Sequence, residues 1–284
     1  MTRRFPPWLK HKIAPPAVML EMKNLIAGLN LHTICESARC PNIGDCFSRK
    51  TATFLILGDV CTRNCAFCAV KKGAPVPVDK KEPQSVLRAV QSLDLRYVVI
   101  TSVTRDDLDD GGASQFTKVV KTLQEHKNHI IIELLIPDFC GSFKALTSVV
   151  KSGPHVINHN IETVPRLYRK VRPKAVYTRS LDLLKKVKGI NSTTITKSGL
   201  MLGLGETMEE VVDVMKDLRK ADCDLITIGQ YLQPSSKHYR VLEFVSPEKF
   251  FQYKQIGMEM GFAGVVSAPF VRSSFKAAEL YEAV

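Results

Sequence analysis

Short apolar runs recur along the chain after about residue 50, with segments of helical periodicity between them. Uninterrupted runs rich in Val and Ile predict strands buried on both faces of a parallel sheet. They fall at Thr53–Leu57, Arg96–Thr101, Ile130–Ile136, His155–Asn160, Thr193–Leu202 and Leu225–Ile228. Helical spacing predicts helices at Ser85–Leu93, Ala113–His126, Ser142–Lys151, Thr178–Lys188, Thr207–Ala221 and Pro247–Met260. The alternation predicts about six βα units.

This α/β pattern lacks a nucleotide-type glycine fingerprint and favours a partial (βα) barrel, with an open doubly wound sheet as the alternative. A short helix at Ala17–Leu29 is expected before the barrel. We expect an N-terminal extension at residues 1–50, a barrel domain at 51–265 and a C-terminal extension at 266–284. Catalytic residues of such barrels follow the C-terminal ends of the strands.

The composition is that of an ordinary globular protein, with 45% hydrophobic and 24% charged residues among 284. No apolar run approaches the roughly 20 residues that a membrane-spanning helix needs. The basic N-terminus is interrupted by Pro6 and Pro7 and has no apolar core typical of a secretory signal. We expect a cytoplasmic protein that interacts with neither membrane nor nucleic acid. The net charge of +12 nevertheless suggests an anionic partner.

Most of the cysteines fall into two sets near the start of the barrel. The first set is Cys35-x4-Cys40-x5-Cys46, in a stretch of turn-forming residues that predicts a loop. The second is Cys61-x3-Cys65-x2-Cys68, directly after the first strand. In a long chain of the reducing cytosol, crowded cysteines bind metal more often than they form disulfides. Cys140 and Cys223 have no spaced partners, and we expect both to be small buried side chains.

Three thiolates on one tight loop suit a cubane iron–sulfur cluster, whose irons prefer sulfur ligands. A cubane has four irons, so three cysteines leave one iron open to a substrate or cofactor. A structural zinc site is the alternative, but such sites usually pair two C-x2-C knuckles and use four protein ligands. The pattern of three cysteines therefore favours a cluster with an open coordination position.

The second cysteine set, with Phe67 before its last cysteine, resembles the signature of radical S-adenosylmethionine enzymes. In that superfamily the open iron of a 4Fe–4S cluster binds S-adenosylmethionine, whose reductive cleavage releases a 5′-deoxyadenosyl radical. The resemblance implies that Cys61, Cys65 and Cys68 are cluster ligands and act in catalysis.

The first cysteine set resembles the N-terminal motif of lipoyl synthases, which holds an auxiliary 4Fe–4S cluster. The resemblance implies that Cys35, Cys40 and Cys46 ligate that cluster. The family's fourth ligand is a serine of a C-terminal Arg-Ser-Ser-Tyr motif, and this chain has Arg272-Ser273-Ser274-Phe275. Ser274 is favoured over Ser273 as the ligand, and the choice stays open. Phe275 departs from the family's tyrosine, which puts any required hydroxyl hydrogen bond in doubt.

Further segments extend the resemblance along nearly the whole chain: Thr101–Ala113, Asn158–Thr163, Lys197–Glu206 and Gln230–Pro234. The family's activity is the insertion of two sulfur atoms at carbons 6 and 8 of an octanoyl group on a carrier-protein lysine. The auxiliary cluster supplies the sulfur. The resemblance also implies three protein partners: an octanoylated lipoyl carrier protein or domain, a reductant such as ferredoxin or flavodoxin, and a protein that rebuilds the auxiliary cluster.

Five residues outside the cysteine sets are candidates for binding S-adenosylmethionine. Asn160 and Glu162 follow the fourth strand, and the alternative is a polar pair that caps the next helix. Gly203 and Glu206 follow the fifth strand, where a plain turn is the alternative. Arg179 is assigned either to this cofactor or to carrier docking.

Two other functions compete with sulfur insertion. One is a different radical S-adenosylmethionine enzyme whose auxiliary cluster binds substrate instead of being consumed. The other is a zinc- or cluster-bearing nucleic-acid-binding protein, suggested by the charge and the cysteines. The chain shows no RNA-binding or helix-turn-helix signature, which argues against the second.

Overall fold

The computed structural model describes residues 5–10, 15–126 and 129–284. Its centre is an eight-stranded sheet in the order β1-β2-β5-β6-β7-β8-β9-β10. The strands are β1 His32–Thr33, β2 Thr53–Ile56, β5 Tyr97–Ser102, β6 Ile131–Leu135, β7 Val156–Asn158, β8 Ile195–Leu202, β9 Leu225–Gln230 and β10 Gly264–Ser267. All neighbouring strands run parallel except β1, which is antiparallel to β2.

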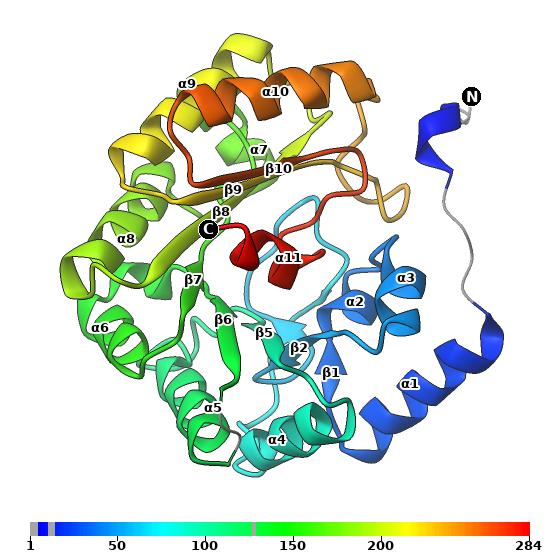
Figure 1. Cartoon of the computed structure of the whole chain (residues 1–284), viewed down its shortest axis with the longest axis vertical. Coiled ribbons are helices and arrows are strands. Elements are labelled where there is room, and N and C mark those ends of the chain that lie inside the picture. Colours follow the sequence, from blue (N-terminus) through cyan, green and yellow to red (C-terminus); the bar gives the residue numbers. More distant parts are fainter. Residues whose placement is uncertain (1–4, 11–14, 127–128) are drawn as a thin grey trace.

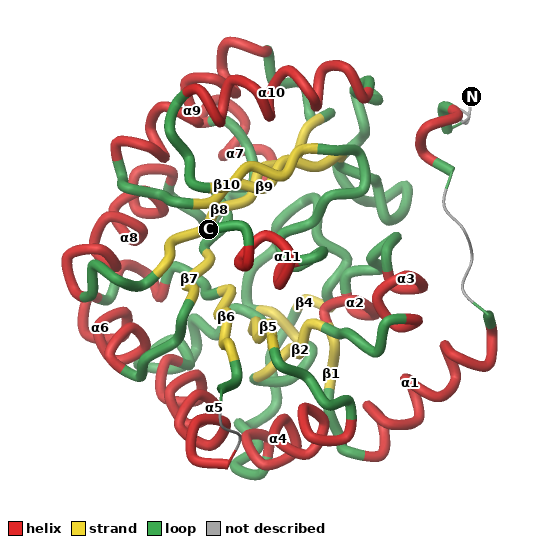
Figure 2. Tube along the Cα trace, in the orientation of Figure 1, coloured by secondary structure: helices red, strands yellow, loops and turns green. Residues whose placement is uncertain are grey.

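Six long helices cover the outer face of this curved sheet (Figure 1). They are α4 Glu82–Ser92, α5 Ala113–His126, α6 Phe143–Lys151, α8 Tyr177–Ile190, α9 Met208–Lys220 and α10 Pro247–Glu259. Figure 2 shows the strands as an incomplete ring inside the helices. The sheet order ends at β1 and β10, so the ring is open. The partial (βα) barrel is confirmed, and the doubly wound alternative would have placed helices on both faces.

Local sequence explains how the outer helices form. In α5 the buried Phe116, Val119, Val120 and Leu123 recur three and four residues apart, which turns one apolar stripe toward the sheet. At the start of α9, Thr207 and Glu210 form a reciprocal capping box. Such a box satisfies N–H groups that the first helical turn leaves without partners.

The remaining elements complete the described part of the chain. They are η1 Pro7–Leu9, α1 Pro16–Gly28, α2 Ile34–Ser37, α3 Ile43–Ser48, β3 Val60–Cys61, β4 Lys71–Lys72, η2 Phe139–Gly141, η3 Pro165–Leu167, α7 Tyr168–Val171 and α11 Ala277–Glu282. The expected loop around the first cysteine set is therefore partly wrong, since α2 and α3 lie there. Thr33 accepts a hydrogen bond from the Glu36 N–H and starts α2. None of the described helices is long and apolar enough to cross a membrane.

The stretch around the first cysteine set contacts the C-terminal extension. Asn42, fully buried beside the first cysteine set, donates its side-chain N–H to the carbonyl of Phe270 at 2.7 Å. Arg49 of the N-terminal part pairs with Glu279 of α11 at 3.3 Å. Helix α11 lies within the ring of strands in Figure 1, and the Tyr281 ring is 5.7 Å from Tyr97 at the start of β5.

A buried ion pair and its hydrogen bonds join four strands inside the barrel, β5, β6, β7 and β8. The Lys197 ammonium lies 3.0 Å from Glu133, and both side chains are at most 1% exposed. Glu133 also accepts hydrogen bonds from Tyr97 and from Asn158. We expect Lys197→Met to lower the free energy of unfolding by about 3–5 kcal/mol, because a buried carboxylate would lose its cation. Urea denaturation measures the loss.

The matched control for this prediction is Lys216→Met. Lys216 forms an exposed pair with Asp213 at 2.9 Å, and we expect a loss below about 1 kcal/mol. Equal effects of the two substitutions would contradict the assigned importance of the buried pair.

Candidate functional site

The loop of the second cysteine set lies at the C-terminal ends of the strands. Directly after Cys61 at the end of β3, the Thr62 N–H donates to the Thr104 carbonyl, which follows β5, at 3.1 Å. The Ala66 N–H donates to the Val171 carbonyl at 2.9 Å. These two backbone bonds fix the loop at the barrel mouth, where such folds carry their chemistry.

The three thiols of this loop lie close enough to act on one another. Burial raises the pKa of the Cys68 thiol to about 12, the Val70 N–H opposes the rise, and the charges of Cys65 and Cys61 add to it. The Arg63 N–H lies 3.4 Å from the Cys61 sulfur. Metal binding deprotonates such thiols, and N–H bonds to sulfur help to tune a bound cluster.

Arg63 belongs to this loop, and no motif in the sequence marks it as a functional residue. Its guanidinium is 6% exposed and lies 2.8 Å from Asp106 and 2.6 Å from Asp138. These acids follow β5 and β6, so one arginine ties the cysteine loop to two neighbouring strands. Cys140 lies 3.5 Å from Arg63 and is exposed, so its expected burial is wrong. Cys223 is buried as expected.

The first cysteine set also brings its thiols together. Burial raises the pKa of Cys35 to about 12, and the charges of Cys40 and Cys46 contribute to the rise. Burial likewise raises the pKa of Cys46 to about 11. Cys35 and Cys46 line a cavity of about 500 Å³, which also reaches the first residues of β2, β5 and β6.

The C-terminal segment 271–275 crosses the inner face of the barrel over two glycines. A side chain at Gly229 of β9 would overlap the carbonyl of Val271. A Cβ atom at Gly199 of β8 would lie 2.6 Å from the Asn160 Oδ1 and 2.7 Å from the Ser273 Oγ. Glycine within these strands therefore permits a close approach of the C-terminal segment.

The two candidate serines face different surroundings. Ser274 lines the cavity that Cys35 and Cys46 also line. Ser273 instead donates its hydroxyl to the Asn160 Oδ1 at 2.8 Å. Ser274 therefore shares a cavity with the first cysteine set, while Ser273 faces the candidate cofactor residues.

Glu162 is a half-buried carboxyl that interacts electrostatically with Arg272 and with Cys65 of the second cysteine set. Burial raises its pKa, while the charges of Arg172 and Arg272 lower it. Burial raises the pKa of Cys65 in the second set, and the charge of Glu162 adds to that rise. Burial also raises the pKa of Cys40 in the first set, and the charge of Arg272 opposes that rise.

Asn160 and Glu162 do not cap the following helix, because η3 begins at Pro165 without a side-chain cap. Their side chains bond each other, with Asn160 Nδ2 donating to Glu162 Oε1 at 3.1 Å. Arg172 donates to the Asn160 carbonyl at 3.0 Å, and its buried Nε–H has no partner among the described residues. An unpartnered buried donor beside these groups suits an anionic ligand.

Gly203 and Glu206 lie in the loop between β8 and α9. The Glu206 carboxylate accepts hydrogen bonds from the N–H groups of Gly203 and Leu204. Gly203 has a φ of +98°, which favours glycine. The turn of the alternative interpretation is present, the helix cap itself is Thr207, and cofactor binding by Gly203 and Glu206 stays a prediction.

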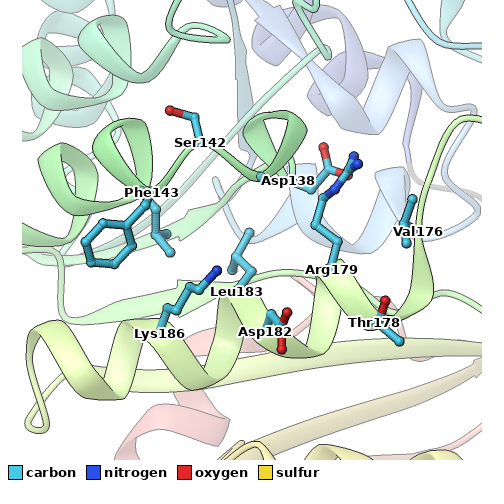
Figure 3. Close-up of a pocket in the computed structure, with 11 residues that line it drawn as sticks. Asp138, Ser142, Phe143, Val176, Thr178, Arg179, Asp182, Leu183 and Lys186 are labelled. Atoms are coloured by element: carbon cyan, nitrogen blue, oxygen red, sulfur yellow. The ribbon is translucent and has the colours of Figure 1, made fainter.

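Arg179 lies in α8. It lines a cavity of about 270 Å³ between α6 and α8, and Figure 3 shows Asp138 beside it. Its guanidinium is 3.2 Å from Asp138, which also binds Arg63 of the cysteine loop.

The pKa of Asp138 makes stability dependent on pH. Although burial alone would raise it, Arg63 lowers this pKa from 3.8 to about 2. A depressed carboxyl pKa gives stability that is complete above 3.8 and is lost as pH falls toward 2. We expect this carboxylate to contribute up to about 2 kcal/mol. In urea denaturation from pH 7 to 2, the free energy of unfolding should fall less at acid pH in Asp138→Asn than in the native protein. An equal fall in both proteins would contradict the assignment.

The donor sets fit two 4Fe–4S clusters. Each set offers three sulfur donors, the ligand type that iron–sulfur clusters use, and the first adds a hydroxyl that lines the same cavity. Among the described residues, no group of three or more His, Cys, Asp or Glu side chains is placed so that it could hold a single metal ion.

Comparison with protein families identifies two matching models. The model of the radical SAM superfamily matches residues 55–218, more than half of the chain. The model of the N-terminal domain of lipoyl synthase of the radical SAM family matches residues 1–40.

Curated relatives match over nearly the full length. A lipoyl synthase of Caldanaerobacter subterraneus subsp. tengcongensis is 56% identical over 277 residues, which is 98% of this chain and 97% of the relative. Those of Caldicellulosiruptor saccharolyticus and Aquifex aeolicus are 54% and 56% identical, covering 98% and 92% of this chain and 98% and 95% of the relatives.

Solved structures support the fold. HydG, a maturase of the FeFe-hydrogenase, matches with a TM-score of 0.60 at 14% identity, covering 89% of this chain and 63% of its own. Methylornithine synthase (PylB) matches with a TM-score of 0.56 at 14% identity, covering 84% and 73%. The radical SAM model spans more than half of the sequence, and the curated relatives are more than half identical over nearly all of it. This chain therefore belongs to the lipoyl synthase family of radical S-adenosylmethionine enzymes.

Proposed function

We propose that this chain inserts two sulfur atoms at carbons 6 and 8 of an octanoyl group carried on a protein lysine, giving the lipoyl cofactor. The observation that carries the proposal is the pair of cysteine sets in one barrel, with Ser274 lining the cavity of the first set. An unactivated methylene has no acidic proton, so acid–base catalysis cannot open it and a cofactor must supply the chemistry.

Cys61, Cys65 and Cys68 would hold a 4Fe–4S cluster with one open iron. Cys35, Cys40, Cys46 and Ser274 would hold the auxiliary cluster. When bound, the first cluster supplies the electron that cleaves S-adenosylmethionine, and the second supplies sulfur. A serine hydroxyl is a harder and weaker ligand for iron than a thiolate, so Ser274 would release its iron more readily than a cysteine would.

The remaining candidates would bind S-adenosylmethionine. Asn160 and Glu162 offer oxygen acceptors for its amine and hydroxyl groups, and the unpartnered Arg172 N–H offers a donor for its carboxylate. The loop from Gly203 to Glu206 would contact the adenosine through its backbone. A contact of Arg179 with the cofactor stays a prediction, because its guanidinium pairs with Asp138.

We propose an octanoylated carrier protein or domain as the substrate, a ferredoxin or flavodoxin as the electron donor, and a cluster-carrying protein that rebuilds the auxiliary site. The net charge of +12 favours an acidic carrier surface. We place these reactions in the cytoplasm. If binding of the octanoylated carrier did not weaken with added salt, electrostatic steering would be wrong.

An anaerobic single turnover tests the proposed function. The reconstituted protein is mixed with S-adenosylmethionine, a strong reductant and an octanoyl-lysine peptide, and the products are analysed by mass spectrometry. We expect 5′-deoxyadenosine with mono- and then dithiolated peptide, and about eight iron and eight sulfide per chain. Deoxyadenosine without thiolated peptide would contradict sulfur insertion, and zinc in place of iron would contradict radical chemistry altogether.

A further inference from the structure

We propose that Ser273 is a positioning residue that couples the C-terminal cluster segment to the S-adenosylmethionine site, so that each strengthens the other. The inference rests on the proposed function, which assigns Asn160 and Glu162 to cofactor binding and Ser274 to the auxiliary cluster. Ser273 directly precedes Ser274 of the auxiliary site. Its hydroxyl donates a hydrogen bond to the Oδ1 of Asn160, a candidate cofactor residue, at 2.8 Å.

The Asn160 side chain is held in one orientation by two bonds. Its Oδ1 accepts from Ser273, and its Nδ2 donates to Glu162 at 3.1 Å. The backbone of Asn160 is fixed separately, because Arg172 donates to its carbonyl at 3.0 Å. Ser273 therefore determines how the Asn160–Glu162 pair is presented to a ligand, and its removal would leave the main chain in place.

The space for this contact is provided by Gly199. A Cβ atom there would lie 2.6 Å from the Asn160 Oδ1 and 2.7 Å from the Ser273 Oγ. Real Cβ atoms do not approach oxygen so closely, so any larger residue would separate the two side chains. The C-terminal segment reaches this position because Gly229 admits the backbone at Val271, two residues earlier.

The next residue after Ser273 is Ser274, which lines the cavity that Cys35 and Cys46 also line. The adjacent serines Ser273 and Ser274 thus face the two candidate cofactor sites. Coupling between binding sites is reciprocal, so a segment that raises the affinity for S-adenosylmethionine must itself be stabilised by that cofactor to the same degree.

The first experiment measures the dissociation constant of S-adenosylmethionine by equilibrium dialysis on protein with both clusters reconstituted. A net hydrogen bond of typical strength corresponds to roughly a 3- to 10-fold change. We expect Ser273→Ala to weaken binding by about that factor while iron content stays unchanged and the urea unfolding midpoint falls no further than in the control variant. The matched control is Ser267→Ala, which removes a half-buried hydroxyl that donates to the Phe250 carbonyl at 2.7 Å.

A second variant disrupts the same hydrogen bond through the residue packed against it. Gly199→Ala leaves both serines unaltered and should weaken S-adenosylmethionine binding at least as much, because the added Cβ also displaces Asn160 itself. Since the Ser273–Asn160 contact is already broken in Gly199→Ala, adding Ser273→Ala should weaken binding less there than in the native protein. Fully additive losses would overturn the proposal.

Hydrogen exchange tests the reciprocal effect. Saturating S-adenosylmethionine should slow exchange of the amides at 271–276 in the native protein but not in Ser273→Ala. A Ser273→Ala protein that loses stability or iron yet binds S-adenosylmethionine normally would reduce Ser273 to a structural residue and overturn the inference alone. If the native protein does not bind S-adenosylmethionine, the proposed function fails and the inference fails with it.

Discussion

Replacing Cys65 with alanine is expected to abolish formation of 5′-deoxyadenosine and of thiolated peptide together. Burial, together with the charges of Glu162 and Cys61, raises the pKa of the Cys65 thiol, and the charge of Cys65 adds to the raised pKa of Cys68. Loss of even an outer partner of a metal ligand costs about 10–100-fold in affinity or activity, so loss of a ligand should exceed about 100-fold. Iron should fall from about eight to about four per chain, because only the auxiliary site would remain.

Cys140→Ala is the control for this prediction. Cys140 is exposed and belongs to neither cysteine set, although its thiol lies 3.2 Å from Asp106. We expect its iron content and deoxyadenosine formation to match the native protein. If Cys65→Ala kept about eight iron atoms and cleaved S-adenosylmethionine normally, the cluster would lie elsewhere.

The periodic part of the fold is predictable from sequence because buried parallel strands and amphipathic helices carry strong local signals. The strand expected at Thr193–Leu202 is β8, Ile195–Leu202, and the helix expected at Ala113–His126 has those same bounds. The strand β10 escaped detection because its four residues begin with glycine and show no long apolar run. Helix α11 has six residues and follows Lys276 in the left-handed region, so its position depends on tertiary contacts.

Some residues of the candidate site are predictable from the sequence and others are not. The cysteine sets are visible because their spacing along the chain is itself the signal. Arg63 was missed because its partners Asp106 and Asp138 lie 43 and 75 residues away, and no local pattern connects them. Ser273 and Ser274 are identical neighbours in the sequence, so nothing local distinguishes them. Their different environments arise because the C-terminal segment crosses β8 and β9.

Replacing Ser274 with alanine is expected to stop sulfur insertion while cleavage of S-adenosylmethionine continues. At saturating S-adenosylmethionine the second cysteine set is intact, so deoxyadenosine should still form. Thiolated peptide should fall by more than about 100-fold, because the auxiliary cluster would lose a ligand that lines the cavity of Cys35 and Cys46. Single-turnover mass spectrometry measures both products in one sample.

Ser274→Cys provides the matched comparison, since it keeps a ligand but makes it a thiolate. A thiolate binds iron more tightly than a hydroxyl does, so we expect full iron content together with slow sulfur insertion. Cys46→Ala should behave like Ser274→Ala, because both remove a ligand from the same cluster. If Ser274→Ala inserted sulfur at the native rate while Ser273→Ala did not, the ligand would be Ser273, and the hydrogen bond to Asn160 would have to break when the cluster is bound.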